Sequence, residues 1–211
     1  MSKREILLAT QERSINRLVH FTNVKNLLNI IKFGLLPISE LDDNEIEYDY
    51  NDELRLDNNP DSISISITSP NYKMFYKIRR EKYEENWAVI ILDVEKVLNL
   101  ECAFCYTNAA NSEITSIPLT ELKTLNAFEE MFSECSGKPS RRILGLHDYD
   151  TTDPQAEILV FDKIPVSAIK CVVFEDPITM SNFSDDLRQV GIHCVVNDEF
   201  FAPRHDYTYW Q

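Results

Sequence analysis

The sequence predicts an α+β domain in which several strands are interspersed with a few short helices. Three observations support this prediction. One segment alternates strictly between apolar and hydroxyl side chains, several others are short apolar runs, and the stretches around them carry apolar residues at helical spacing. The chain has 211 residues and is 44% hydrophobic, which is enough to build a sizeable core. We therefore expect one domain spanning residues 1–211.

The first clear element is a short strand over residues 18–21 that leads directly into a helix. Thr22 or Asn23 can cap this helix, because a side-chain oxygen accepts a hydrogen bond from a backbone N–H of the first turn. Gly34 stands where a left-handed glycine commonly ends a helix. His20 therefore lies at a strand-to-helix junction. The apolar residues at positions i, i+3, i+4 and i+7 of the helix are Val24, Leu27, Leu28 and Ile31.

The remaining strands follow in order along the chain. In segment 62–70 the isoleucines face one way, and the serines and Thr68 face the other. A helix is expected over residues 123–134 and another near 180–190, whereas residues 111–119 are expected to form a loop. Four further apolar segments are typical of strands. They are 87–94, 155–162, 168–176 and 191–198.

The net charge of −14 argues against general nucleic-acid binding, but the charge is uneven. Between Ser39 and Asp61 there are ten carboxylates and a single cation, Arg55. Segments 73–82 and 138–142 are instead rich in cations. Each of these clusters taken alone is most simply a solvated face. Together they allow a local basic surface beside an acidic loop.

Several classes of protein are disfavoured by composition. The four glycines provide no glycine-rich phosphate loop, and no apolar run is long enough to cross a membrane. The start of the chain lacks the apolar core of a signal peptide. Cys102 and Cys105 form a C-x-x-C pair without a second pair, so no metal site is expected. Five scattered cysteines fit reduced thiols, which indicates a cytoplasmic protein.

Two residues are candidates for chemistry. His20 ends a short apolar run, and Glu157 stands at the mouth of an otherwise apolar strand. The ordinary interpretation of His20 is a half-buried histidine with a local hydrogen-bond partner. The ordinary interpretation of Glu157 is an exposed acid at a strand edge, since an uncompensated buried carboxylate is costly.

Four segments in chain order resemble the DarT family of DNA ADP-ribosyltransferases, relatives of the poly(ADP-ribose) polymerases. They are HFTNVKNLLNIIKFGLL (20–36), NDELRLDNNPDSISISITSPNYKMFYKI (51–78), WAVIILDVEKVLNLECAFCYTNAA (87–110) and TDPQAEILVFDKIPVSAIKCVVF (152–174). The resemblance implies an ADP-ribosyltransferase fold, with a split mixed sheet and flanking helices. It also implies that NAD is the substrate that supplies ADP-ribose.

The resemblance further implies roles for individual residues. Glu157 matches the catalytic glutamate, and Arg55 matches an arginine that contacts NAD and assists at the acceptor base. A carboxylate suits this chemistry, because cleavage of the nicotinamide–ribose bond develops positive charge on the ribose. The acidic stretch from Ser39 would cover NAD, and residues 107–157 would include the loop that receives the acceptor. The positions implied to hold NAD are His20, Phe21, Thr22, Asn29, Leu36 and Arg55.

The implied acceptor is a base of single-stranded DNA, either guanine or thymine. The segment SPNYKMFYKI is more basic and less proline-rich than expected for thymidine-modifying members, which favours guanine slightly. Aromatic stacking beside a few cations suits a single strand. The implied partner is a macrodomain antitoxin that removes the adduct. The residues expected to hold DNA are Tyr72, Lys73, Met74, Lys77, Arg79 and Arg80.

Other functions stay open at the level of sequence. Within NAD chemistry, the acceptor could be RNA or protein, or NAD could simply be hydrolysed. In a different class, the chain would be a non-catalytic binding module that kept the fold. The presence of Glu157 and Arg55 disfavours that last hypothesis, because sites rather than folds carry function.

Overall fold

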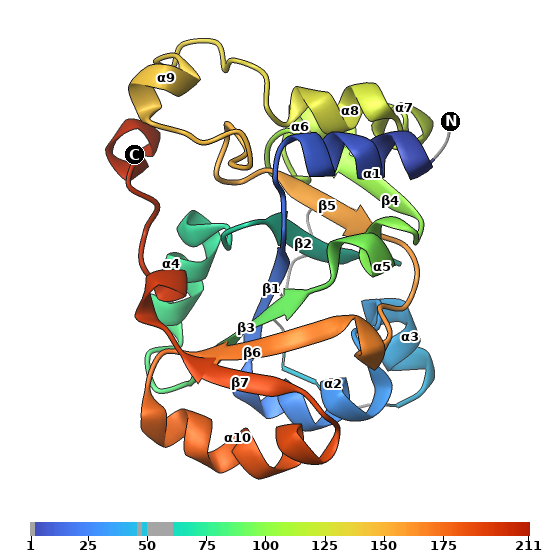
Figure 1. Cartoon of the computed structure of the whole chain (residues 1–211), viewed down its shortest axis with the longest axis vertical. Coiled ribbons are helices and arrows are strands. Elements are labelled where there is room, and N and C mark those ends of the chain that lie inside the picture. The colour runs from blue at the N-terminus through green and yellow to red at the C-terminus, as the bar shows by residue number, and fades with distance from the viewer. Residues whose placement is uncertain (1–2, 46–47, 50–60) are drawn as a thin grey trace.

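The computed structural model describes residues 3–45, 48–49 and 61–211, and it places a central β-sheet between two groups of helices (Figure 1). Helices α1 and α8 lie at one end of the molecule, and α2 and α10 lie at the other. The strands are β1 (Leu18–Asn23), β2 (Ile63–Ile67), β3 (Trp87–Leu92), β4 (Cys102–Cys105), β5 (Glu157–Val160), β6 (Ile169–Phe174) and β7 (His193–Val196). The α-helices are α1 (Lys3–Glu12), α2 (Leu27–Phe33), α3 (Ile38–Asp43), α4 (Tyr72–Glu81), α5 (Val94–Leu98), α6 (Ser112–Thr115), α7 (Leu119–Leu122), α8 (Leu125–Glu130), α9 (Arg141–Leu144) and α10 (Pro177–Gln189). Short 3₁₀ helices are η1 (Val24–Asn26), η2 (Val166–Ala168), η3 (Asp198–Phe201) and η4 (Tyr207–Trp210).

The seven strands lie in the order β4-β5-β2-β1-β3-β6-β7. Neighbouring strands are antiparallel, except that β7 runs parallel to β6. The parallel pair requires a crossover, and helix α10 provides it. The sheet is therefore mixed, as the resemblance implied.

The sheet opens between β1 and β2. Strand β1 pairs with β3 along its whole length, but it pairs with β2 only through Leu18↔Ile67 and Val19↔Ser66. Beyond that point β2 continues its pairing on the other side, with β5. The sheet is thus split at its centre, and the split exposes the inner edges of β1 and β2.

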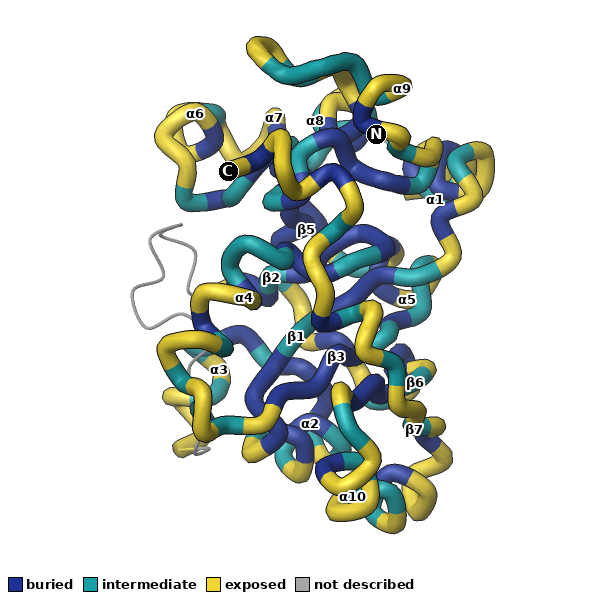
Figure 2. The backbone as a smooth tube through the Cα atoms, turned by 90° about the vertical axis from the view of Figure 1, so that its left-hand side faces the viewer, coloured by how far each residue is buried: buried dark blue, intermediate teal, exposed yellow. Residues whose placement is uncertain are grey.

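The core lies on both faces of the sheet, and the buried segments follow the strands (Figure 2). The isoleucines of β2 pack with α1, α2, α8 and α10 on one face, as the alternation predicted. On the opposite face, α4 and η3 cover β1, β3 and β6 through a cluster that includes Phe75 and Trp87. The serine side of β2 is left to face the split.

The helix after β1 differs in detail from the sequence expectation. It begins with the 3₁₀ turn η1, which Asn23 caps by accepting from Lys25 N–H, and continues as α2. Leu28 is exposed, and Ile30 is buried in its place, because the 3₁₀ turn rotates the apolar stripe. Gly34 has the expected positive φ of 85°, but its ψ of −174° is extended and not left-handed helical.

Two elements near the site were missed by sequence reasoning. Strand β4 is short and was interpreted only as a cysteine pair. Helix α4 was interpreted only as a basic segment, although Asn71 caps it and its apolar residues Phe75 and Ile78 are buried. Segment 111–119, expected to be a loop, contains the four-residue helix α6.

Candidate active site

The split in the sheet forms a cleft of about 1250 Å³, including space open to solvent. Its walls come from β1, the α2–α3 region, β2, the start of α4 and the residue that opens β5. The described residues that the sequence assigned to NAD or to catalysis all line it. They are His20, Phe21, Thr22, Asn29, Leu36 and Glu157, and Met74 of the expected DNA segment joins them.

His20 bridges the split. Its Nδ1 lies 2.9 Å from the carbonyl oxygen of Ser64, a residue that no longer pairs with β1. Because a carbonyl only accepts hydrogen bonds, Nδ1 carries a proton and donates this bond. The ordinary interpretation and the functional one are therefore both compatible with this position: His20 has a local partner and still lines the cleft.

Thr22 and Asn26 anchor a short part of the acidic segment beside the cleft. Thr22 is buried, and its Oγ1 accepts from Asn26 Nδ2 at 3.0 Å. The same amide group of Asn26 donates to the backbone oxygen of Asp49 and accepts from the Asp49 N–H, at 2.9 and 2.8 Å. The Asn26 side chain thus makes the two hydrogen bonds to the Asp49 backbone that a neighbouring strand would make. Asp49 and Tyr48 consequently line the same cleft.

Gly34 sets the position of the wall formed by Leu35 and Leu36. A Cβ on Gly34 would lie 2.3 Å from the carbonyl oxygen of Ile164, and φ is positive there. Leu35 and Ile164 exchange two backbone hydrogen bonds of 3.0 and 2.9 Å. Only glycine allows this approach.

Glu157 is the first residue of β5, and its carboxylate is buried in the wall of the cleft with a residue exposure of 6%. Oε1 accepts from Asn108 Nδ2 at 3.0 Å and from Asn71 Nδ2 at 3.3 Å. Oε2 accepts from the backbone N–H of Ala109 at 3.4 Å. The interpretation as an exposed edge acid is wrong, because this carboxylate is buried and accepts from three donors among the described residues.

The chain reaches Asn71 through a strained turn. Thr68, directly after β2, has a φ of 65°, which is unfavourable for a β-branched residue. Its N–H donates to Arg17 O at 3.2 Å, and its hydroxyl donates to Tyr149 O at 3.2 Å. These bonds hold the turn that directs Asn71 into the cleft.

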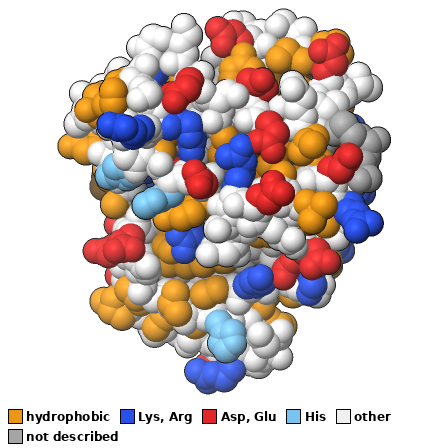
Figure 3. Space-filling model, turned by 45° about the horizontal axis from the view of Figure 1, so that its top comes forward, with side chains coloured by type: hydrophobic (Ala, Val, Ile, Leu, Met, Phe, Trp, Pro, Cys, Tyr) orange, Lys and Arg blue, Asp and Glu red, His pale blue; other side chains and the backbone are white. Residues whose placement is uncertain are grey.

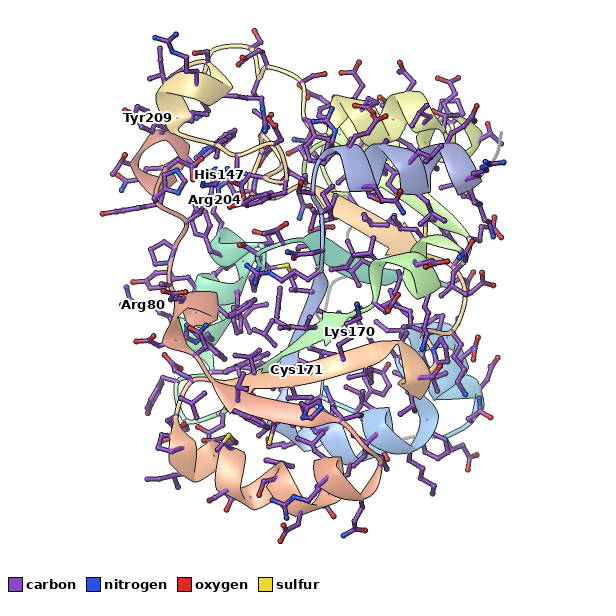
Figure 4. The ribbon with its side chains drawn as sticks, in the orientation of Figure 1. Arg80, His147, Lys170, Cys171, Arg204 and Tyr209 are labelled. Carbon is purple, nitrogen blue, oxygen red and sulfur yellow. The ribbon has the colours of Figure 1, made fainter. Side chains whose placement is uncertain are left out.

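The residues expected to bind DNA do not act as one group. Lys73, Lys77 and Arg80 share the outer face of α4 by their i, i+4, i+7 spacing, and Arg80 projects at the outer edge of the molecule (Figure 4). Lys77 lies 4.0 Å from Glu81, and Arg80 donates to the Tyr76 hydroxyl at 3.4 Å. Only Met74 of this segment lines the cleft.

Tyr72 and Arg79 are placed differently from the expectation. Arg79 donates to Phe201 O at 2.8 Å, pairs with Glu175, and lies over the ring of Phe75, so it ties α4 to η3 and β6. The hydroxyl of Tyr72 is buried and makes no hydrogen bond within the described residues. Burial and the neighbouring Asp206 raise the pKa of Tyr72 to about 12. Both side chains therefore serve packing in this conformation.

The segment before β5 is held by the C-terminal end of the chain. Arg204 donates to the backbone oxygens of Thr151 and Thr152 and makes two bonds of 2.7 Å to the buried Asp206. In Figure 4, Arg204 and His147 lie between α9 and α4. Figure 3 shows Lys, Arg and His side chains on the side where α9 and the C-terminal end lie, with Asp and Glu side chains among them.

No metal centre is apparent within residues 3–45, 48–49 and 61–211, because no group of three or more His, Cys, Asp or Glu side chains is arranged to hold an ion. Cys102 and Cys105 stand on opposite faces of the sheet, Cys102 in the core with α1 and α8 and Cys105 with α6 and α7. None of the five cysteines, all of which are described, forms a disulfide bond. Among the described helices none is long and apolar enough to cross a membrane.

Arg55 lies outside the described residues, as does most of the acidic stretch that was expected to cover NAD. Its assignment therefore stays a prediction from the resemblance. Asn71 and Asn108 are the site residues that sequence reasoning missed. The signal for Asn71 was its place before α4 as an N-cap, and Asn108 follows β4, which had itself been missed.

The split mixed sheet, with a buried glutamate opening one strand and an H-x-T segment on the facing strand, defines the class of ADP-ribosyltransferases. The sequence model of one family, described as "ssDNA thymidine ADP-ribosyltransferase, DarT", matches residues 19–201. The chain belongs to the DarT family, and its enzyme class is that of the NAD-dependent single-stranded-DNA ADP-ribosyltransferases. None of the curated protein sequences compared with the chain matches it significantly.

Solved structures confirm the fold. Thermus sp. 2.9 DarT in complex with NAD⁺ is 15% identical, with 89% of this chain and 98% of that chain covered and a TM-score of 0.58. The same protein in complex with ADP-ribosylated ssDNA is 15% identical, with 90% and 97% covered and a TM-score of 0.61. Thermosipho africanus DarTG in complex with ADP-ribose is 16% identical, with a TM-score of 0.62. The match covers 88% of this chain but 51% of the DarTG chain, so this chain spans about half of that protein.

Proposed function

We propose that this protein transfers ADP-ribose from NAD to thymine in single-stranded DNA, with Glu157 as the catalytic carboxylate. The observation that carries the proposal is the position of Glu157. Its carboxylate is buried, is fixed by three donors, and faces the cleft that His20 and Thr22 line from the opposite side of the split.

The residues around the cleft suit NAD. His20, Phe21 and Thr22 of β1 provide an aromatic face and polar groups for the nicotinamide half, and Asn29 and Leu36 line the wall beyond them. The serine side of β2 supplies hydroxyl groups along the floor. This arrangement needs no glycine-rich loop. Arg55 would contact NAD and assist at the acceptor, as the resemblance implies.

The chemistry requires a negative charge beside the ribose. As nicotinamide leaves with the electrons of its bond to ribose C1, positive charge develops on the sugar ring. Glu157 stabilises that charge and orients the ribose hydroxyls, an effect commonly worth about 10²–10³ in rate. The acceptor nitrogen then forms the new bond to C1 and releases its proton to water. Thymidine offers one ring N–H for this step.

Thymine replaces the slight sequence-based preference for guanine, because the family description names thymidine. The target base must leave the stack to reach the cleft, which favours a single strand over a duplex. Lys73 and Lys77 on the outer face of α4 are proposed to hold the strand, since Met74 on the adjacent face lines the cleft. Tyr72 and Arg79 are not included in this set.

The partner we propose is a macrodomain antitoxin that hydrolyses the adduct, since the solved relative from Thermosipho africanus is a DarTG. The compartment we propose is the cytoplasm, where five cysteines without a disulfide stay reduced. The reaction is proposed to need no metal.

Mass spectrometry of oligonucleotides tests the acceptor. Single-stranded 20-mers that contain one thymidine are expected to gain one ADP-ribose in the presence of NAD. Matched oligomers with that thymidine replaced by guanosine, and RNA of the same sequence with uridine, are expected to stay unmodified. Modification of the guanosine oligomer alone would restore the guanine hypothesis, and NAD hydrolysis without any adduct would contradict transfer to nucleic acid.

A further inference from the structure

The orientation of two asparagine amides around Glu157 is fixed by the backbone. Asn71 Oδ1 accepts from Met74 N–H at 3.2 Å, and Asn108 Oδ1 accepts from Ala110 N–H at 2.9 Å. Each amide oxygen is therefore committed to a backbone donor. Each NH₂ group must then point the other way, and both donate to the same oxygen of Glu157.

Asn71 combines two tasks that other capping residues cannot combine. It is 1% exposed and caps the ten-residue helix α4. Ser and Asp cap helices about as well as Asn. An ionised Asp, however, has no donor, and a Ser hydroxyl is too short to serve both partners. Asn is the capping residue that supplies an acceptor for the helix and a neutral N–H donor for the carboxylate.

The two amides come from elements that are far apart in sequence. Asn71 starts α4, Asn108 follows β4, and Glu157 opens β5. Met74, one helical turn after Asn71, lines the cleft beside them. The Glu157 carboxylate is thus held by residues next to α4 and β4, and not by its own strand.

We infer that Asn71 and Asn108 are positioning residues, which hold the Glu157 carboxylate in the orientation that meets the ribose. The inference rests on the proposed role of Glu157. It extends that role, because the N-cap residue of α4 would also position the catalytic carboxylate. The other titratable side chains that line the cleft within the described residues are His20, Tyr48 and Asp49.

Two substitutions at Asn71 separate positioning from folding. Asn71→Ser and Asn71→Asp both keep a good N-cap, so α4 is preserved. Loss of one hydrogen bond to a charged group is expected to lower kcat about tenfold to hundredfold in Asn71→Ser. The dissociation constant of NAD is expected to change less than about twofold, because the amide acts through Glu157.

Asn71→Asp adds a pH signature. Two carboxylates that share a site raise the apparent pKa of the pair, because both cannot be ionised at close range. At pH 7.5 the variant is expected to be at least as impaired as Asn71→Ser. As the pH falls through the raised pKa, one bound proton restores a donor to Glu157. The deficit relative to wild type is therefore expected to shrink at least tenfold between pH 7.5 and pH 5.5.

Asn197→Asp is the matched control. Asn197 caps η3 by accepting from Glu199 N–H at 2.9 Å, and it lies outside both the cleft lining and segment 107–157. This variant is expected to keep wild-type kcat and pH dependence. Thermal melting of all variants checks that each is folded.

The outcomes distinguish this inference from the proposed function. If Glu157→Gln is inactive while folded Asn71→Ser keeps wild-type kcat, the positioning role is wrong and the catalytic assignment stands. If Asn71→Ser weakens NAD binding tenfold without lowering kcat, Asn71 contacts substrate directly and the inference is likewise wrong. If Glu157→Gln itself is active, the proposed function fails first. Reduced kcat in Asn71→Ser, with a deficit in Asn71→Asp that shrinks at low pH, supports the inference.

Discussion

Gly34→Ala is expected to damage the cleft wall through one backbone contact. The new Cβ would lie 2.3 Å from Ile164 O, whereas real Cβ atoms essentially never approach closer than 3.0 Å. The bridge between Leu35 and Ile164 must therefore move apart, which endangers two backbone hydrogen bonds of about 0.5–1.5 kcal/mol each. The backbone of Gly34, with φ 85° and ψ −174°, adds a cost on the order of 1–3 kcal/mol for any residue with a Cβ. The sum is a loss of about 2–6 kcal/mol in the free energy of unfolding.

Gly191→Ala provides the control for this prediction. Gly191 has a φ of 76°, but a Cβ there meets nothing within 4 Å. It carries the conformational penalty of about 1–2 kcal/mol without the clash. Urea unfolding of both variants, followed by circular dichroism, is expected to show Gly34→Ala less stable than Gly191→Ala by about 1–3 kcal/mol, the contribution of the two hydrogen bonds. Equal losses in the two variants would refute the argument, because the clash with Ile164 would then have no energetic consequence.

Further predictions concern single side chains. Tyr72→Phe removes a buried hydroxyl without a hydrogen-bond partner in the described residues, so the free energy of unfolding should stay unchanged or rise by up to about 1 kcal/mol. The ionisation with a pKa of about 12 should vanish from an ultraviolet titration. A clear loss of stability would contradict this prediction. Burial alone would raise the pKa of Asp206, but bonds from Arg204 and Trp210 outweigh it and hold the pKa below its ordinary value. The stability that Asp206 contributes is therefore present above its unfolded pKa and lost as the pH falls through its lower folded pKa. In acid unfolding, Asp206→Asn should therefore flatten the decline of the free energy of unfolding below about pH 4. An unchanged slope there would contradict the stabilising role of the Arg204–Asp206 pair. Reversal of Lys73 and Lys77 to Glu should lower modification of a single-stranded 20-mer about tenfold and leave NAD hydrolysis within about twofold; undiminished modification would return these lysines to a solvated face.

The fold was predictable where periodicity was strong. The isoleucine alternation of β2 and the apolar runs of β3, β5 and β6 correspond to strands, since burial on one or both faces sets those patterns. Strand β4 was not predicted, because its four residues, C-A-F-C, are too few to show a strand pattern. Helix α4 was masked by its cations, which lie on the outer face while Phe75 and Ile78 are buried.

The site was predictable in part, and for different reasons. His20, Thr22 and Glu157 were found through their position in motifs of the DarT family, and the structure places them around one cleft. Asn71 and Asn108 were not found, because their function depends on three elements that meet only in the folded chain. A sequence pattern shows which residues are neighbours along the chain. The split between β1 and β2 depends on which strands pair in the folded sheet, and the pattern does not show this. The exposure of Leu28 was not predicted either, because the 3₁₀ turn before α2 rotates the apolar face of the helix.

The central claim is that the buried carboxylate of Glu157 drives transfer of ADP-ribose to thymine, and Glu157→Gln tests it most directly. This change keeps the size of the side chain and removes its charge. Single-turnover measurement with NAD and a thymidine-containing single strand is expected to show a loss of at least about 10²-fold in rate, with NAD affinity within about threefold of wild type, because the charge acts mainly on the transition state. A folded variant that keeps its rate within about tenfold, a change of less than about 1.4 kcal/mol, would contradict the account.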